Sequence, residues 1–387
     1  MSKFQWLKDE LAAIEAESLL RKPICIDSAQ GVKVNVGGSE KVLFCSNNYL
    51  NLACDQRIIS AATDAMAKFG YGSAASRLIS GTMAPHVELE KKLAELFGKE
   101  SSLVFSSGFV ANEALIKTLP GKGDLLLLDK LDHASIMSAS SDSDATFRTF
   151  HRGQYEKAER FLVSDKFNRR FIITESIFSM DGDLAELEKL VELRNKYDAI
   201  LIVDEAHAFG CMGKNGAGMA DEMGLLSDVD IIVGTLSKAA GCVGGFLAGN
   251  KCVTDYIVNK AKEFIYTTAP AVVNCAAAMT AIDIFKAEPQ RQERLRENAA
   301  YLRNKLIKIG CDIGQSQSHV VPVIIGDNQR TVDISAKLFG AGFVVVAIRP
   351  PTVLPGTARL RISLQCDHTK EQIDELCDAL KKILNET

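Results

Sequence analysis

Short, almost uniformly apolar runs alternate with helical patterns through the middle of the chain. Strands as apolar as these are typical of a parallel sheet that is covered on both faces. Between the runs, apolar residues at helical spacing predict helices at 108–118 and 187–197. Because strands alternate with helices, we expect an α/β domain. The predicted strands lie at residues 103–105, 125–128, 171–174, 200–203 and 231–233.

The pattern changes from about residue 287, where this regular alternation ends. The order of the elements that follow predicts a smaller α+β domain. Near the N-terminus, residues 4–20 mix acids with apolar residues at helical spacing, which predicts an amphipathic helix. In the C-terminal part, the predicted helices lie at 290–309, 333–340 and 371–384, and the predicted strands at 320–325, 343–348 and 358–364.

We therefore expect an α/β protein with a large domain on a mostly parallel sheet and a smaller α+β C-terminal domain. The large domain is expected at residues 46–286 and the small one at 287–387. Residues 1–45 are expected to supply an N-terminal helix and strands that pack with the small domain. A chain of 387 residues is long enough to bury the core that such a fold needs.

Charge and cysteine usage exclude several classes of protein. The 45 basic and 49 acidic residues give a formal charge of −4, and basic blocks among aromatic residues are absent, so we expect no nucleic-acid partner. No run is apolar enough to cross a membrane. The ten cysteines are scattered singly, which argues against a metal site and predicts small buried side chains. Because a secretory signal is absent, we expect a reducing, cytoplasmic setting.

Polar side chains follow two of the predicted strands at their carboxyl ends. Asp204 ends one strand, and His207 follows three residues later. The next strand runs into Thr235, Ser237 and Lys238. Ligands of parallel sheets bind beyond the carboxyl ends of the strands. An acid, a lysine and hydroxyls are the groups that hold the ring nitrogen, aldehyde and phosphate of pyridoxal 5′-phosphate (PLP), so the pattern predicts a PLP enzyme.

Each of these residues also has an ordinary structural interpretation. Lys238 must lose its proton to become nucleophilic, which its apolar strand and the glycines at 241–245 favour, and otherwise it is a surface lysine. A buried carboxylate needs a partner. For Asp204 that partner is a pyridinium N–H, or else an arginine or the start of a helix. His207 bonds the phenolic oxygen of the cofactor, or else it is a satisfied core or surface residue.

Two more strand ends carry polar residues. The segment 106–109 lies between a strand and a helix, where free N–H groups and a glycine suit a phosphate. Such turns often contain serine and glycine without any ligand. His133 follows the strand at 125–129 and can stack on a planar ring. In its ordinary interpretation, His133 caps a helix or lies at the surface.

Three arginines lie close together in the predicted small domain. Arg349 precedes the run Pro350-Pro351, and Arg359 and Arg361 alternate with apolar residues along a predicted strand. The planar fork of an arginine suits a substrate carboxylate. We expect Arg359 and Arg361 to share a face of that strand, with one of them binding substrate and the other making a structural ion pair.

A series of ordered motifs covers nearly the whole chain. They lie at residues 45–50, 72–82, 105–112, 132–135, 175–183, 204–207, 235–238 and 264–268. Taken together, these motifs resemble those of the α-oxoamine synthases, which are PLP-dependent enzymes of fold type I. The resemblance implies PLP as the cofactor, an acyltransferase activity, and a homodimer with its sites at the subunit interface.

The resemblance also implies roles for individual residues. Lys238 would bind the aldehyde of the cofactor, Asp204 its ring nitrogen and His207 its phenolic oxygen. His133 would stack on the ring, and Thr267 or Thr268 would reach the phosphate held by the partner subunit. Further cofactor contacts are implied for Gly108, Phe109, Glu175, Ser179, Thr235 and Ser237. Substrate contacts are implied for Arg21, Asn47, His133, Arg349, Thr352 and Arg361, with Arg361 on the amino-acid carboxylate.

Within the family, residues 347–353 and 356–361 resemble the member that condenses L-alanine with a pimeloyl thioester of coenzyme A (CoA) or acyl carrier protein (ACP), in biotin synthesis. Rival members use glycine with acetyl-CoA or succinyl-CoA, or serine with a long acyl-CoA. A transaminase and a non-catalytic PLP-binding subunit are more distant alternatives. The chain departs from the family pattern at His151-Arg152-Gly153 and at Ala239-Ala240, and either change affects acyl-chain preference without removing a catalytic group.

Overall fold

The computed structural model describes residues 2–386, which form two compact units. The large unit contains residues 52–179 and 184–292. The small unit contains the residues up to 51, the short segment 180–183, and the residues from 293 onward. The border near residue 292 falls inside a single helix, α12, which spans Gln290–Lys308.

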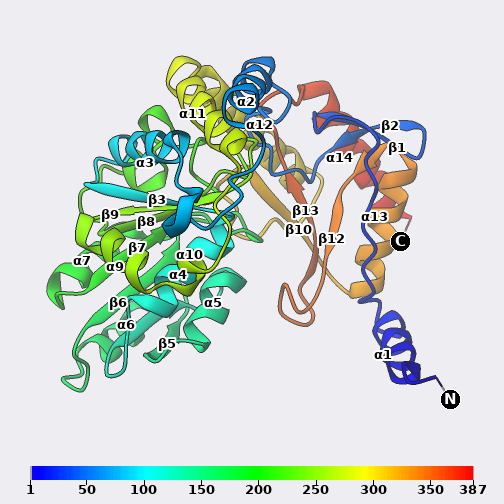
Figure 1. Cartoon of the computed structure of the whole chain (residues 1–387). Coiled ribbons are helices and arrows are strands. Elements are labelled where there is room, and N and C mark those ends of the chain that lie inside the picture. The colour runs from blue at the N-terminus through cyan, green and yellow to red at the C-terminus, as the bar shows by residue number, and fades with distance from the viewer. Residues whose placement is uncertain (1, 387) are drawn as a thin grey trace. The chain divides into compact units, whose positions relative to one another are not determined.

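A seven-stranded sheet forms the centre of the large unit, in the order β3-β9-β8-β7-β6-β4-β5 (Figure 1). The strands from β5 to β8 pair in parallel through β4, β6 and β7, whereas β9 runs antiparallel to both β8 and β3. The mostly parallel sheet predicted from the sequence is therefore confirmed. The strands are β3 (Ser101–Phe105), β4 (Leu125–Asp129), β5 (Thr146–Phe150), β6 (Arg170–Glu175), β7 (Ile200–Asp204), β8 (Ile231–Thr235) and β9 (Gly245–Gly249).

Helices cover both faces of this sheet, as its uniformly apolar strands require. On one face, Leu126, Ile173 and Ile202 are buried together with Leu115 of α4, each contributing about 2 kcal/mol of transfer free energy. On the other face, Phe246 of β9 packs against other buried phenylalanine rings. The helices of the large unit are α2 (Gln56–Phe69), α3 (Ala84–Leu96), α4 (Gly108–Thr118), α5 (Ala134–Ser141), α6 (Tyr155–Leu162), α7 (Leu187–Lys196), α8 (Met219–Glu222), α9 (Lys251–Lys260), α10 (Lys262–Ile265) and α11 (Val272–Ala287).

Two strands of the large sheet were not predicted from the apolar pattern. Strand β5 lies at the sheet edge, and only Phe150 within it is buried, so its sequence lacks a continuous apolar run. Strand β9 begins and ends with glycine and follows a glycine-rich turn, which made the segment look like a loop. Both strands are specified by pairing with their neighbours, because their own residues are weak strand formers or only partly buried.

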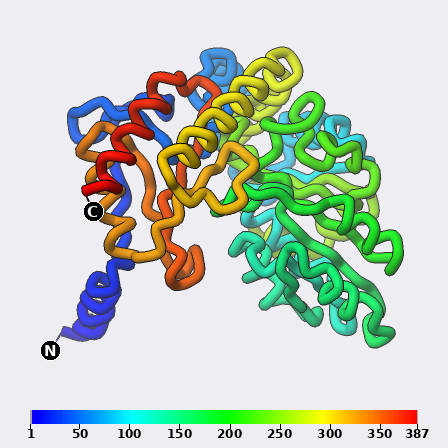
Figure 2. Tube along the Cα trace, turned by 180° about the vertical axis from the view of Figure 1, so that it is seen from behind, coloured from blue at the N-terminus to red at the C-terminus, as the bar shows by residue number. Residues whose placement is uncertain are grey.

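The small unit contains two three-stranded sheets, of order β1-β2-β11 and β10-β13-β12. In Figure 2 the blue N-terminal part of the chain runs beside the orange and red C-terminal part of this unit. The pairing of β2 with β11 joins these two parts directly. The strands are β1 (Lys33–Val36), β2 (Ser39–Leu43), β10 (Val320–Gly326), β11 (Phe343–Val344), β12 (Val346–Ile348) and β13 (Ala358–Ser363), and the helices besides α12 are α1 (Gln5–Ala16), α13 (Asn328–Gly340) and α14 (Lys370–Asn385).

The single strand predicted at 343–348 is wrong. Residues 343–344 form β11, which pairs with β2, and residues 346–348 form β12, which pairs with β13 of the other sheet. Val344 and Val345 are both buried, whereas Val346 is 37% exposed. Two successive buried side chains break the alternation that one strand requires, so the chain passes from one sheet to the other at Val345.

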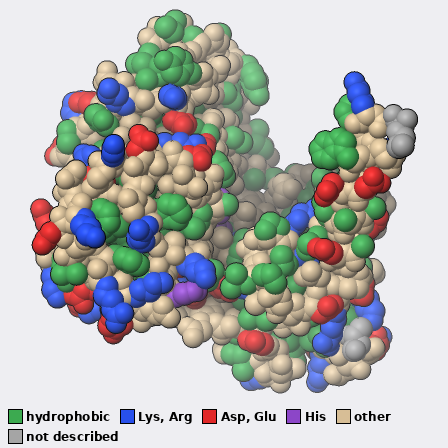
Figure 3. Space-filling view, turned by 90° about the horizontal axis from the view of Figure 1, so that it is seen from below, with side chains coloured by type: hydrophobic (Ala, Val, Ile, Leu, Met, Phe, Trp, Pro, Cys, Tyr) green, Lys and Arg blue, Asp and Glu red, His purple; other side chains and the backbone are tan. Residues whose placement is uncertain are grey.

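The predicted amphipathic helix near the N-terminus forms as α1, but none of its residues is buried. Apolar side chains lie along this helix at the surface (Figure 3), and Trp6, the one tryptophan of the chain, is 62% exposed. In the described part of the chain, no helix has the length and apolar character needed to cross a membrane.

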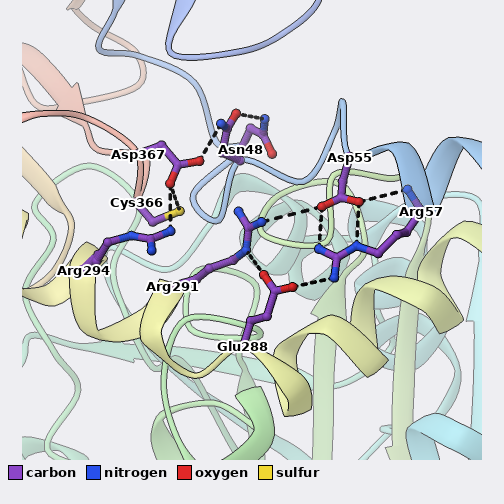
Figure 4. Close-up of polar contacts among 9 residues, drawn as sticks. Asn48, Asp55, Arg57, Glu288, Arg291, Arg294, Cys366 and Asp367 are labelled. Atoms are coloured by element: carbon purple, nitrogen blue, oxygen red, sulfur yellow. Dashed lines mark hydrogen bonds and ion pairs between the residues drawn. The ribbon is translucent and has the colours of Figure 1, made fainter.

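A charged network joins helix ends in the large unit (Figure 4). In the large unit, Arg57 at the start of α2 pairs with Asp55 and with Glu288 at the end of α11. Arg291 of α12 pairs with the same two carboxylates, so four alternating charges join α2, α11 and α12. Networks of this kind contribute more than isolated exposed pairs, because each side chain is held by two partners.

We predict that Gly245→Ala destabilises the large unit by about 1–3 kcal/mol, as overpacking does in other cores. A β-carbon at this position would lie 2.3 Å from the backbone nitrogen of Gly108, where α4 begins. Urea unfolding of the variant and the wild type measures the change. Gly72→Ala is the matched control, because a β-carbon there meets nothing within 4 Å. Equal stability of both variants would contradict the close packing of β9 on the start of α4.

Candidate active site

A cavity of about 180 Å³ lies in the large unit beside the carboxyl ends of its parallel strands. This is the position where ligands of such sheets bind. Its wall combines residues from strand ends with residues from the first turns of helices. The lining residues are Ser107, Gly108, Phe109, Asn112, His133, Ser135, Glu175, Asp204, Ala206, Thr235 and Lys238. The structure thus brings most of the predicted cofactor residues of the large unit into one cavity.

Asp204 is held firmly at the end of β7. The side-chain amide of Asn112 donates to Asp204 Oδ2 over 2.8 Å, and the backbone N–H of Ala206 donates to Oδ1 over 2.9 Å. Asn112 also donates to Ser135 Oγ over 3.0 Å. The acid predicted from the sequence is therefore oriented by amide groups rather than by an arginine.

Asn112 is a site residue that the sequence reasoning did not single out, although it lies in one of the family motifs. It occupies the buried face of α4 between Ala111 and the apolar residues that follow. A buried asparagine in a helix needs hydrogen-bond partners. The sequence signal for Asn112 is therefore a polar residue among the apolar positions of a helix that directly follows a strand.

Lys238 also lines the cavity, so it is not an isolated surface lysine. Its Nζ lies 2.8 Å from Nε2 of His207, which makes these two residues hydrogen-bonded neighbours. The turn from β8 to β9 carries Lys238 and is closed by Leu236, whose N–H donates to the carbonyl of Gly244. This short, closed turn limits where the lysine amine can lie.

His133 caps a helix, as its ordinary interpretation predicted, and it also faces the cavity. The helix is α5, and Nδ1 of His133 accepts the backbone N–H of Ser135 over 3.2 Å. With Nδ1 as the acceptor, the proton of the neutral ring is on Nε2. Burial lowers the pKa of His133, and the positive charge of Lys238 acts in the same direction against the attraction of Asp204. The ring is therefore neutral at pH 7.

The start of α4 forms another part of the wall. The hydroxyl of Ser107 caps the helix by accepting the N–H of Val110 over 3.2 Å. A β-carbon on Gly108 would approach that of Thr235 to 3.2 Å, so glycine permits the close contact between α4 and β8. Thr235 accepts the N–H of Ser237 over 3.1 Å. The helix start offers free N–H groups and a positive dipole end, which suit an anion.

Other predicted cofactor residues lie in the large unit but outside the lining of this cavity. His207 is not part of the lining but contacts Lys238 through its ring nitrogen Nε2. Ser179 is buried, whereas Ser237 is exposed. Thr267 is half-buried, and Thr268 is exposed and bridges to Ser76.

The predicted carboxylate-binding arginines lie on β13 of the small unit and have different partners. Arg359 is buried and forms an ion pair with Asp181, and it also donates to Thr357. Arg361 donates to Ser363 Oγ over 2.8 Å and to Asn47 Oδ1 over 3.3 Å, both uncharged groups. Arg359 therefore makes the structural ion pair that the sequence assigned to one of the two arginines.

The other predicted substrate residues of the small unit form a separate contact. Arg21 donates to the carbonyl of Pro350 over 2.8 Å, and Arg349 donates to the carbonyls of Ser18 and Leu20. Burial lowers the pKa of Arg349, and the nearby charge of Arg21 adds to that effect. Thr352, two residues beyond Pro350, is exposed. The two arginines thus join the N-terminal segment to the Arg-Pro-Pro run.

Comparison with known proteins gives the family. The model of the family "Aminotransferase class I and II" matches residues 39–380. The 8-amino-7-oxononanoate synthase of Petrotoga mobilis is 40% identical over 99% of this chain and 98% of its own length. The 8-amino-7-oxononanoate synthase 1 of Bacillus subtilis is 38% identical over the same shares of the two chains.

Solved structures agree with this result. Serine palmitoyltransferase of Sphingomonas wittichii has a TM-score of 0.93 at 31% identity, covering 100% of this chain and 98% of its own. A structure of SPT with PLP internal aldimine has the same TM-score at 30% identity and the same coverage. The 8-amino-7-oxononanoate synthase of Francisella tularensis has a TM-score of 0.78 at 27% identity, covering 89% of this chain and 98% of its own.

The chain belongs to the aminotransferase class I and II family, and within it to the group of these 8-amino-7-oxononanoate synthase relatives. The family resemblance inferred from the sequence motifs is confirmed, and so is the fold class.

We predict that Asp181→Asn lowers the free energy of unfolding by about 1–3 kcal/mol, because it leaves the buried charge of Arg359 without its anion. Denaturant unfolding followed by circular dichroism measures the loss. Glu40→Gln removes the carboxylate from an ion pair of which both members are more than half exposed, and it serves as the control with no expected change. Equal effects of the two substitutions would contradict a structural role for the Arg359 pair.

Proposed function

We propose that this protein is a PLP-dependent acyltransferase that condenses L-alanine with a pimeloyl thioester in biotin biosynthesis. A bond forms between the α-carbon of alanine and the thioester carbonyl. The thioester C–S bond and the bond from the α-carbon to the alanine carboxylate break. The products are 8-amino-7-oxononanoate, carbon dioxide, and CoA or ACP. The observation that carries the proposal is the convergence of Asp204, His133 and Lys238 on one cavity, and the names of the relatives support the substrates.

The residues of the cavity fit the proposed cofactor. Among the described residues, two buried atoms of its wall, Asn112 Oδ1 and Glu175 Oε1, have no hydrogen-bond partner, as expected where a polar ligand completes the site. The start of α4 would hold the phosphate, with Gly108, Phe109 and Thr235 beside it, and Ser179 and Ser237 would help. When bound, PLP supplies an electron sink for the carbanion of the amino acid.

The protein side chains would orient the cofactor and move the proton. Asp204, fixed by Asn112 and Ala206, would pair with the ring nitrogen. The neutral ring of His133 offers a flat face for stacking. Lys238 would bind the aldehyde, and when amino acid displaces it, its amine would take the α-proton. His207, 2.8 Å from that amine, holds it in place.

Residues of the small unit would bind the substrates. Arg361 would hold the carboxylate of alanine, and this choice is supported by the ion pair that already occupies Arg359. Asn47 bonds Arg361 and would orient it. The proposed contacts to the remainder of the substrate are Arg21, Arg349 and Thr352. We propose that residues 46–286 form the PLP-binding domain and residues 287–387 the small domain, with which residues 1–45 pack.

The working form in this proposal is a homodimer with its sites at the subunit interface. Thr267 or Thr268 would reach the phosphate held by the partner subunit, which fits their position away from the cavity of their own chain. We also propose a cytoplasmic setting, because all ten cysteines carry free thiols, as expected in a reducing compartment.

The test is product formation from L-alanine with pimeloyl-CoA and with pimeloyl-ACP, detected by mass spectrometry. We expect 8-amino-7-oxononanoate with at least one of the two thioesters. Lys238→Ala should lower the rate by about a thousandfold or more. Lys122→Ala, which changes an exposed lysine of the same unit, should leave it unchanged. A folded, PLP-loaded protein that gives no product from alanine with either thioester would rule out the substrate assignment.

A second candidate is the condensation of serine with a long acyl thioester. The high TM-score of the serine palmitoyltransferase from Sphingomonas wittichii favours it, although that protein is less similar in sequence than the synthases above. The same assay with serine and palmitoyl-CoA, and with glycine and acetyl-CoA or succinyl-CoA, separates the candidates. Product from only one of these pairs would move the assignment to that sister reaction.

A further inference from the structure

Two acidic side chains end adjacent strands at the wall of the cavity. Glu175 is the last residue of β6 and Asp204 the last of β7, and the parallel pairing sets them opposite each other. Both are buried, and both line the cavity. Two neighbouring buried carboxyl groups do not both ionise unless each has its own compensating charge, because burial and mutual repulsion oppose the second charge.

The hydrogen bonds assign the charge to Asp204. Its two oxygens accept N–H groups from Asn112 and Ala206. Glu175 has one backbone N–H, that of His133, close to its carboxyl group. Its other oxygen, Oε1, has no hydrogen-bond partner among the described residues. Donors stabilise a carboxylate, so the group with fewer donors is the one that keeps its proton.

The charged groups around Glu175 act in both directions. The pKa of Glu175 is raised to about 8, first by its burial and then by the charge of Asp204 on β7, against the opposing charges of Lys238 and Arg152. From the turn after β4, Asp132 accepts the backbone N–H of Glu175 over 3.0 Å. The pKa of Asp132 is itself raised, first by its burial and then by its acidic neighbours. The positive charges of Lys238 and Arg152 therefore do not offset the effect of burial on the pKa of Glu175.

We propose that Glu175 works as a neutral carboxylic acid, leaving Asp204 as the single ionised carboxylate of the cavity, and that it positions His133. In this state, Glu175 accepts the backbone N–H of His133 through one carboxyl oxygen. Its other oxygen carries the proton and can donate a hydrogen bond. One carboxylate would then face the one positive charge of the ring nitrogen. This role deepens the proposed function and rests on it only for the identity of the cofactor.

The protein without cofactor gives the first test, by infrared spectroscopy of carbon-13 glutamate-labelled protein. A protonated glutamic acid band should be present at pH 7 and should disappear as the pH rises through about 8. Glu175→Gln should remove this band, and Glu205→Gln should leave it, because three hydrogen-bond donors to the carboxyl of Glu205 oppose the rise in its pKa that burial causes. Absence of the band at pH 7 in the wild type overturns the proposal, even if the substituted proteins do not fold.

Thermal unfolding of the same proteins gives a second test. The folded pKa of Glu175 lies above the ordinary value of 4.5, so its stabilising contribution is complete below pH 4.5 and is lost as the pH rises through about 8. The melting temperature of Glu175→Gln relative to wild type should therefore rise between pH 5 and pH 8 and level off above. A difference that does not change with pH contradicts a neutral Glu175.

PLP affinity separates the roles of the two acids. At pH 7, Glu175→Gln should weaken PLP binding by less than about threefold, because one neutral group replaces another. Asp204→Asn should weaken it by about 100-fold or more, because the cation loses its anion. Similar large losses in two folded variants would make Glu175 a second anion and overturn the proposal. The infrared and melting experiments need neither cofactor nor substrate, so failure of the proposed reaction would not affect them.

Discussion

The candidate site depends on the parallel register of β6, β7 and β8. Parallel pairing brings the carboxyl ends of these strands to one edge of the sheet, with Glu175 opposite Asp204 and Thr235 on the next strand. The apolar side chains within these strands offer no partner to a charged group. The charged side chains therefore lie where the strands end. The chemistry of the cavity follows from this geometry, because each strand end contributes a polar group to the same wall.

Hydrogen bonds and burial then determine how each group in that wall is held and whether protonation is favoured. Two N–H donors hold the carboxyl group of Asp204 in place, whereas burial opposes the protonated form of His133. Lys238 is held by a closed turn and by His207. The result is one firmly placed anion, one neutral ring and one amine around a small cavity, which is the arrangement that a cationic ring with an aldehyde requires.

Much of this could be predicted from the sequence, because the strands are short, almost uniformly apolar runs and the acid and lysine lie at or just beyond their ends. The sequence marks Asn112 only as a polar residue among apolar ones, because its partner Asp204 is distant in sequence and meets it only in the folded chain. The choice between Arg359 and Arg361 needed the position of Asp181, which is distant in sequence. Strand β9 and the break at Val345 are set by pairing with other strands, so local patterns did not reveal them.

The central claim is that Lys238 binds the cofactor in the cavity beside Asp204. Borohydride reduction of the protein in the presence of PLP, followed by peptide mass mapping, tests it most directly. The account predicts that the added mass of the cofactor is found on the peptide that contains Lys238, and that Asp204→Asn reduces the labelled fraction. Labelling of another lysine, or equal labelling of many lysines at the surface, would contradict the account.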